Sequence, residues 1–224
     1  MIPLGDENPS RAPTFVTWTL ILANVLVFLF ELSQGFDGYE QMIIAFGLTP
    51  HTLLHEGTYV TLLTSMFLHA DIFHLGGNML FLYVFGDNVE DSCGHTGFLI
   101  FYLISGVGAS ILHVVLDPYS TIPTIGASGA ISGLLAAYVV LFPRARIRTL
   151  LSLGWFIRMV RVPAYIMIGT WFLYQLLYAF LVSDSMVAYW AHIGGFITGL
   201  ALIRLFARRR PESTHTPYQV TYRY

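Results

Sequence analysis

The sequence predicts an all-α polytopic membrane protein, a bundle of six transmembrane helices with both chain ends in the cytosol. Three observations predict it. The 224 residues are 55% hydrophobic and only 11% charged, with a mean hydropathy of +0.65, which is too apolar for a water-soluble domain of this length. The apolar residues gather in runs of about 20, the length that crosses roughly 30 Å of hydrocarbon. The arginines lie only before the first run, between the fourth and fifth runs, and at or after the end of the sixth run. This is the distribution expected when all cations are cytosolic.

Six apolar runs are long enough to be spans, and in chain order they are residues 14–32, 72–90, 98–116, 125–142, 162–182 and 187–206. A polar segment with three prolines precedes the first run, and it lacks the clustered cations of a signal peptide. We therefore expect the first run to be a retained span. Asp71 stands directly before the second run and has the side chain of a helix N-cap.

The segments outside the runs define three further regions. Residues 1–13 are predicted to be a cytosolic N-terminal segment, and residues 207–224 a cytosolic, mobile tail. Residues 33–71 are polar at first and then apolar again, but polar side chains interrupt them, so they are too broken to span. We expect them to form a partly membrane-embedded external loop of one six-span domain over residues 14–206.

The orientation follows from the cations, which are all arginines. Arg11 precedes the first run, five arginines lie between positions 144 and 161, and five lie between positions 204 and 223. If the N-terminus is cytosolic, six spans put all eleven cations in the cytosol. This predicts the N-in, C-in topology.

The fourth run opens with "TIGASGAISG", residues 124–133, whose three glycines and two serines are unusual in a membrane helix. In the predicted topology Ser128 lies about one turn, roughly 5 Å, below the outer end of this span. His192, in "YWAHIGGFITG", has a similar depth in the sixth span, which runs in the same direction. Each of the two spans also carries small residues at intervals of four, which permit close packing of the two helices. They are Gly129 and Gly133 in the fourth span and Ala191, Gly195 and Gly199 in the sixth.

A second polar pair starts at the same outer surface. The second run contains "HLGGN", in which His74 and Asn78 lie one turn apart on one helix face. A serine nucleophile needs a general base and donors for the developing oxyanion, and these residue types supply both. Two structural alternatives stay open: Ser128 bonding only to its own helical turn, and the pair only bonding two helices together. A histidine inside a span favours the functional interpretation, because intramembrane ionisable groups are costly.

These motifs resemble the rhomboid intramembrane serine proteases. "LLTSMFLHADIFHLGGNMLFLYVFGDNVED" is similar to the family's first loop and second span, "GASG" to its nucleophile motif, and "AHIGGFITG" to its last span. The resemblance implies that Ser128 is the nucleophile, His192 the base, and that His74, Asn78 and the Ser128 backbone N–H form the oxyanion hole. It implies a dyad without an acidic third member. His69 matches a position that the family often fills with histidine. The glycines that support helix packing would be Gly126, Gly129, Gly133, Gly195 and Gly199.

The chain departs from the family pattern at two places. Many members carry a Trp-Arg pair in the first loop, where this chain has Val60 and Thr61. Some members have a tyrosine four residues after the nucleophile, stacked on the catalytic histidine, where this chain has Ser132. The sequence therefore leaves open what anchors the loop and what orients the ring of His192.

The function that the resemblance implies is endoproteolysis of transmembrane segments near the outer face, expected in a bacterial inner membrane with the active site opening to the extracytoplasmic side. The expected partners are transmembrane protein substrates and the lipid bilayer, with no nucleic acid, no cofactor and no metal. A zinc protease would need His-Glu-x-x-His, which is absent, although His51 and His55 in "HTLLH" have a metal-like spacing. The remaining alternative is a catalytically silent rhomboid-like protein that binds membrane clients.

Overall fold

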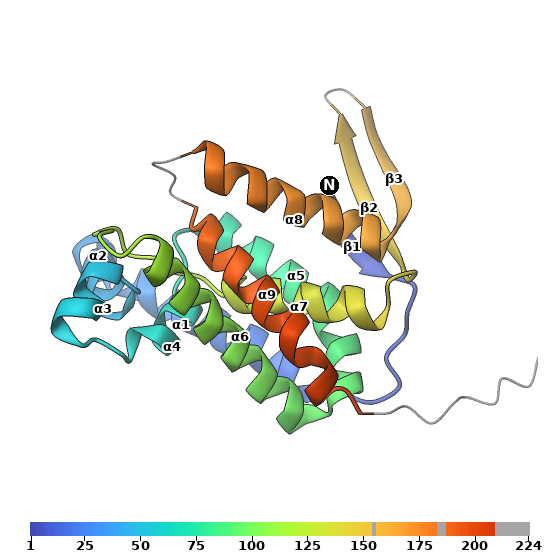
Figure 1. The fold of residues 1–224 in the computed structure, drawn as a ribbon, viewed down its shortest axis with the longest axis horizontal. Helices are drawn as coiled ribbons and strands as arrows, with labels where there is room; N and C mark the ends of the chain where they lie inside the picture. Colours follow the sequence, from blue (N-terminus) through green and yellow to red (C-terminus); the bar gives the residue numbers. More distant parts are fainter. Residues whose placement is uncertain (154–155, 183–186, 209–224) are drawn as a thin grey trace, which may run out of the picture.

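The computed structural model describes residues 1–153, 156–182 and 187–208, and most of these are helical. Each of the six apolar runs overlaps a long helix (Figure 1). These helices are α1 (Phe15–Ser33), α5 (Ile72–Cys93), α6 (His95–Leu116), α7 (Ser128–Leu141), α8 (Ala164–Leu181) and α9 (Tyr189–Phe206). Of the predicted mobile tail, residues 209–224 lie outside the described residues.

Length and composition qualify some of these helices as spans more clearly than others. Within the described part of the chain, α1, α6, α8 and α9 are each long and apolar enough to cross a membrane. Helix α7 is apolar but has only 14 residues, and α5 carries Asp87, Glu90 and Asp91 near its end. The four apolar helices make this an integral membrane protein, whereas the full number of six spans stays a prediction.

The centre of the bundle is the packing of α7 and α6 against α9 (Figure 1). Residues 129–138 of α7 are all buried. A Cβ atom at Gly195 would collide with the carbonyl oxygen of Gly129, and one at Gly199 would collide with that of Gly133. The α7 and α9 backbones therefore lie in direct contact along these glycines, an approach that larger residues would prevent.

Helix α8 packs at the side of this centre and is more exposed (Figure 1). Only Ala164, Met167, Ile168 and Gln175 of its 18 residues are buried. Its large exposed apolar side chains are those of Tyr165, Ile166, Leu173, Tyr174, Leu177, Tyr178, Phe180 and Leu181. A helix with such a surface is suited to contact with lipid.

A three-stranded antiparallel sheet shows that the all-α prediction is wrong in this region. Its order is β1 (Ile2–Asp6), β2 (Arg146–Leu153), β3 (Phe156–Pro163). In β2 the buried Ile147 and Thr149 alternate with exposed arginines, the period-two pattern of a strand with one covered face. The sheet also includes the N-terminal segment, because β1 pairs with β2 from Ile2↔Leu150 to Asp6↔Ile147. The Tyr138 hydroxyl of α7 and the Asn88 amide of α5 both donate to Asp6.

The predicted loop over residues 33–71 is largely helical. It consists of α2 (Gly35–Phe46), α3 (Pro50–Glu56), α4 (Thr61–Thr64) and the 3₁₀ turn η1 (Ser65–Phe67). Three backbone contacts tie it to the segment before α7. They are the bridge Leu48↔Thr124, the hydrogen bond from the His51 N–H to the Ser120 carbonyl, 3.1 Å, and the one from the Gly126 N–H to the Ser65 carbonyl, 2.8 Å. The loop therefore determines how the chain enters α7.

The helix boundaries confirm one prediction and correct two. The Asp71 carboxylate caps α5 by accepting from the N–H groups of Phe73 and His74 at 2.7 and 2.8 Å, as predicted. Helix α7 begins at Ser128 rather than at residue 125, because Gly126 has a φ of +118° and its N–H bonds to the loop. Ser128 is thus the first residue of the helix and does not lie one turn inside it. Helix α8 begins at Ala164 rather than at residue 162, because the preceding two residues end β3.

Candidate active site

Ser128 and His192 meet where α7 and α9 begin. The Oγ atom of Ser128 lies 2.8 Å from Nε2 of His192. Ser128 is the first residue of α7, and His192 is in the first turn of α9, so the glycine contact between the helices brings both to one level. A serine hydroxyl can donate to a neutral imidazole nitrogen at this distance, the arrangement that a nucleophile and its base require.

The second nitrogen of the His192 ring is also bonded. Its Nδ1 atom lies 2.8 Å from Oε1 of Gln175 on α8, a side chain that is only 5% exposed. The rings of Trp171 on α8 and Tyr189 on α9 lie at centroid distances of 6.0 and 6.4 Å. The sequence left open what orients this ring, and Gln175 makes the polar contact. The sequence does contain a signal for Gln175, since it is an amide side chain in an otherwise apolar run. A buried amide is costly without a hydrogen-bond partner.

Ser132 takes no part in holding the ring. Its side chain is fully buried, and its hydroxyl donates to the backbone carbonyl of Ser128 at 2.7 Å, one turn back along α7. This is the internal bond that serines commonly make inside helices. Of the two serines of the motif, only Ser128 thus has its hydroxyl on a histidine.

His74 and Asn78 of α5 face the backbone just before Ser128. A Cβ atom at Gly126 would lie 2.7 Å from Cε1 and 2.8 Å from Nε2 of His74, and 3.6 Å from Nδ2 of Asn78. The His74 Nδ1 atom accepts from the Ala70 N–H at 3.3 Å, so the ring hydrogen is on Nε2, the atom that faces Gly126. Glycine is required here, both for the positive φ and for this close approach.

The side-chain amide of Asn78 is a donor without an acceptor. Asn78 is 6% exposed, and its Nδ2 atom is buried with no hydrogen-bond partner among the residues that the structure describes. Buried donors are nearly always paired, because an unpaired one costs about 1–3 kcal/mol. Together with the His74 Nε2–H, this gives two donors beside the start of α7.

The loop side of the site is held by His69 and Tyr39. His69 is fully buried, and its ring meets that of His74 edge-on at a centroid distance of 5.2 Å. Burial, followed by the neighbouring His74, lowers the pKa of His69 to about 4, so the ring is neutral at pH 7. The Tyr39 hydroxyl donates to the carbonyls of His69 and Ala70 at 3.0 and 2.8 Å. These bonds join α2 to the end of the loop, whereas Val60, at the position of the family's tryptophan, is exposed.

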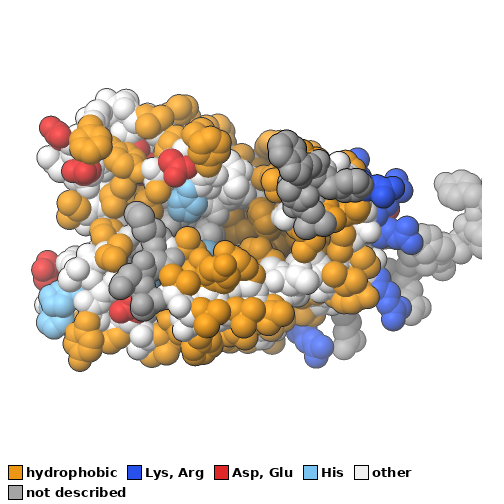
Figure 2. Space-filling model, turned by 90° about the horizontal axis from the view of Figure 1, so that it is seen from above, with side chains coloured by type: hydrophobic (Ala, Val, Ile, Leu, Met, Phe, Trp, Pro, Cys, Tyr) orange, Lys and Arg blue, Asp and Glu red, His pale blue; other side chains and the backbone are white. Residues whose placement is uncertain are grey.

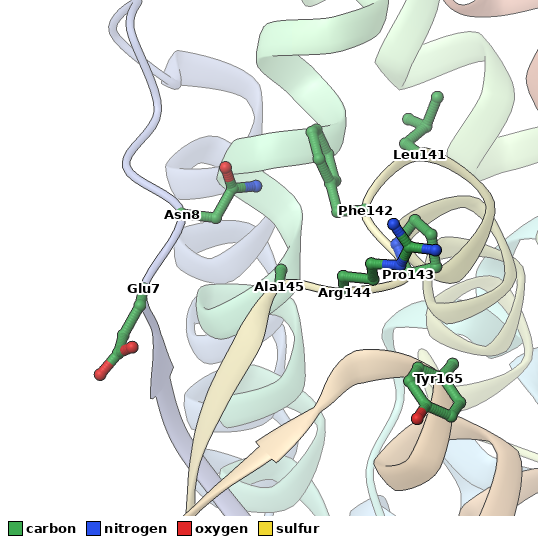
Figure 3. A pocket seen from close by; sticks show the side chains of 8 residues that line it. All are labelled: Glu7, Asn8, Leu141, Phe142, Pro143, Arg144, Ala145 and Tyr165. Atoms are coloured by element: carbon green, nitrogen blue, oxygen red, sulfur yellow. The ribbon is translucent and has the colours of Figure 1, made fainter. Parts of the chain in front are cut away.

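Two other features lie apart from this pair. His51 and His55 of α3 are stacked at a centroid distance of 4.2 Å, and within the described ranges no three His, Cys, Asp or Glu side chains gather to hold a metal. A pocket of about 730 Å³ opens near the sheet, at the end of α7 remote from Ser128 (Figure 3). It is lined by Glu7, Asn8, Leu141, Phe142, Pro143, Arg144, Ala145 and Tyr165.

Fold and site together define an integral membrane protein with a serine–histidine pair held between two closely packed helices. The chain belongs to the rhomboid family, since the family model described as "Rhomboid domain" matches residues 56–209. This confirms the resemblance seen in the sequence.

Relatives from several sources support the assignment. Rhomboid protease GluP of Bacillus subtilis (strain 168) is 35% identical over 189 residues, which are 84% of this chain and 34% of GluP. Rhomboid-like protein 11, chloroplastic, of Arabidopsis thaliana is 29% identical over 91% of this chain and 69% of its own length. Rhomboid protease AarA of Providencia stuartii is 33% identical over 56% of this chain and 50% of its own. The chain thus spans about a third of GluP and half of AarA.

Proposed function

We propose that this protein is an intramembrane serine endopeptidase that cleaves transmembrane segments of membrane-protein substrates near the outer face of the membrane. The observation that carries the proposal is the 2.8 Å contact between Ser128 Oγ and His192 Nε2 in a chain of the rhomboid family. Ser128 attacks the scissile carbonyl while His192 takes its proton and then passes it to the leaving amine. Water hydrolyses the resulting acyl-enzyme, so no cofactor and no metal takes part.

The oxyanion formed by the attack needs donors, and three surround the proposed nucleophile. They are the Nε2–H of His74, the amide of Asn78 and the backbone N–H of Ser128. As the first residue of α7, Ser128 has a backbone N–H without an intrahelical partner, and it lies at the positive end of the helix dipole. The start of α7 at Ser128 therefore favours this role more than the predicted start at residue 125 would.

The substrate must unwind before it reacts. A peptide bond inside a membrane helix is hydrogen-bonded and shielded, so cleavage is expected at small or helix-breaking residues. The broad apolar surface of α8 supports access from the bilayer.

The site is proposed to open to the extracytoplasmic side of a bacterial inner membrane. On the face that Figure 2 shows, Arg side chains lie at the sheet end, and Asp, Glu and His side chains lie toward the opposite end. Acids also occur at the sheet end, where Glu7 pairs with Arg161. With cations inside, the sheet and the pocket of Figure 3 are cytosolic, and six spans put both chain ends in the cytosol. Relatives include mitochondrial and chloroplast proteins, so the compartment is part of the proposal.

Reporter fusions test this orientation. A reporter fused after Tyr224 is expected to behave as cytosolic, because six spans separate it from the cytosolic N-terminus. One inserted near Gly38 in α2 is expected to behave as external, because a single span separates it from that end. Activity of paired alkaline phosphatase and fluorescent protein fusions in intact cells would measure this. The opposite pattern would put Ser128 on the cytosolic side and overturn the proposed cleavage face.

Labelling with a fluorophosphonate tests the nucleophile directly. Ser128 is expected to be labelled and Ser132 to stay unlabelled, because only Ser128 has its hydroxyl on a histidine nitrogen. Mass spectrometry of the purified protein identifies the modified serine, with His192→Ala as the unreactive control. An adduct on Ser132 would reverse the assignment. Absence of any adduct, together with tight binding of a transmembrane peptide, would favour the client-binding alternative.

A further inference from the structure

Gln175 is the one polar side chain among the four buried residues of α8. Its neighbours Leu173, Tyr174 and Leu177 are 53%, 47% and 50% exposed, whereas Gln175 is 5% exposed. An amide buried in a membrane helix is costly unless its polar atoms are bonded. Its oxygen is bonded to His192, the proposed base, at 2.8 Å.

The chemistry of the ring determines what this bond does. When His192 Nε2 accepts from the Ser128 hydroxyl, the one hydrogen of the neutral ring must be on Nδ1. A hydrogen on Nδ1 needs an acceptor, and the carbonyl oxygen of Gln175 supplies it. The nearby rings of Trp171 and Tyr189 limit the ring's movement, but they cannot determine which nitrogen carries the hydrogen.

We propose that Gln175 is the positioning residue of the catalytic base. Its carbonyl oxygen holds the His192 Nδ1–H, so that the Nε2 lone pair stays directed at Ser128. During the attack the Ser128 proton moves to Nε2, and the amide dipole then stabilises the charged ring through the same bond. A neutral amide performs this role without a buried carboxylate in the span. The inference rests on the proposed function, since it needs His192 to act as the base.

Replacing Gln175 by residues of nearly equal size tests whether it acts through its hydrogen bond to His192 or only through packing. Gln175→Met keeps the length of the side chain but removes the carbonyl acceptor, whereas Gln175→Glu keeps an acceptor. Leu173→Met, on the exposed face of the same helix, is the matched control. Each purified full-length variant would be assayed for kcat and KM on a single-span substrate, for the rate of fluorophosphonate labelling, and for Tm.

We expect Gln175→Met to lower kcat and the labelling rate together, by about 10-fold to 100-fold, a part of what a positioned base supplies. The KM and Tm values should match those of Leu173→Met. Gln175→Glu should retain most of the wild-type activity. The acid limb of its kcat–pH profile should move to higher pH, because a carboxylate beside Nδ1 favours the protonated His192 ring. The other titratable groups around His192 are unchanged in this variant; they are His74 on α5, His113 on α6 and Tyr189 on α9.

The outcomes distinguish this inference from the proposed function. If the wild-type protein cleaves and is labelled, but Gln175→Met retains full kcat, the positioning role is wrong and the protease assignment stands. A loss of activity that only follows a loss of Tm, with an unmoved pH profile in Gln175→Glu, would also overturn it. If Gln175→Met fails to fold, the pH profile of Gln175→Glu still decides. A wild-type protein that is neither active nor labelled would reject the proposed function itself.

Discussion

Ser128→Ala and His192→Ala are each expected to reduce cleavage of a single-span substrate to background, a loss on the order of 10⁶-fold. The nucleophile and its base act as one unit through the 2.8 Å bond, so the double variant should be no less active than either single variant. Purified proteins in detergent, incubated with the substrate and resolved by electrophoresis, measure this. Their Tm values should stay close to that of the wild type.

Ser132→Ala is the matched control for the first of these changes. It removes a hydroxyl one turn along the same helix, where the bond is to the Ser128 carbonyl and not to His192. We expect its activity to stay within a few-fold of the wild type. Substantial cleavage by Ser128→Ala or His192→Ala would show that another group carries the reaction, and the dyad would be wrong.

Asn78→Ala is expected to lower kcat by about 10²-fold to 10³-fold, or roughly 3 to 4 kcal/mol of transition-state stabilisation, with little change in KM. Its buried amide lacks an acceptor among the described residues and lies beside the start of α7, so its acceptor would be the oxyanion formed after attack. An interaction made mainly in the transition state affects turnover more than binding. The donors on His74 and the Ser128 backbone remain, which would reduce the effect.

A purely structural role for Asn78 makes a different prediction. If the amide only bonds helices together, its loss should cost about 0.6 kcal/mol of stability and leave kcat per folded molecule unchanged. Asn24→Ala serves as the control, because Asn24 is a buried amide on α1 that donates to the Leu20 carbonyl of its own helix at 2.7 Å. It should alter Tm without altering kcat. Equal behaviour of the two variants would remove Asn78 from the active site.

Local sequence predicted where the long helices lie. Each apolar run overlaps a helix because hydrophobicity over about 20 residues is a property of one continuous segment. The Asp71 cap follows equally from neighbouring residues. The residue types and spacing of Ser128, His192, His74 and Asn78 are also visible in the chain, and their roles stay predictions.

Only the tertiary structure decided features that join distant segments. The sheet pairs residues 2–6 with residues 147–150, so neither segment alone shows its partner. From the sequence alone, the arginines of this region indicate only cytosolic charge. The start of α7 depends on a bond from Gly126 to Ser65 in the loop. The contact of Gln175 with His192 likewise joins two helices. Periodicity along one segment determines which residues form a helix and which face is apolar, but the pairing of polar groups depends on how the helices pack.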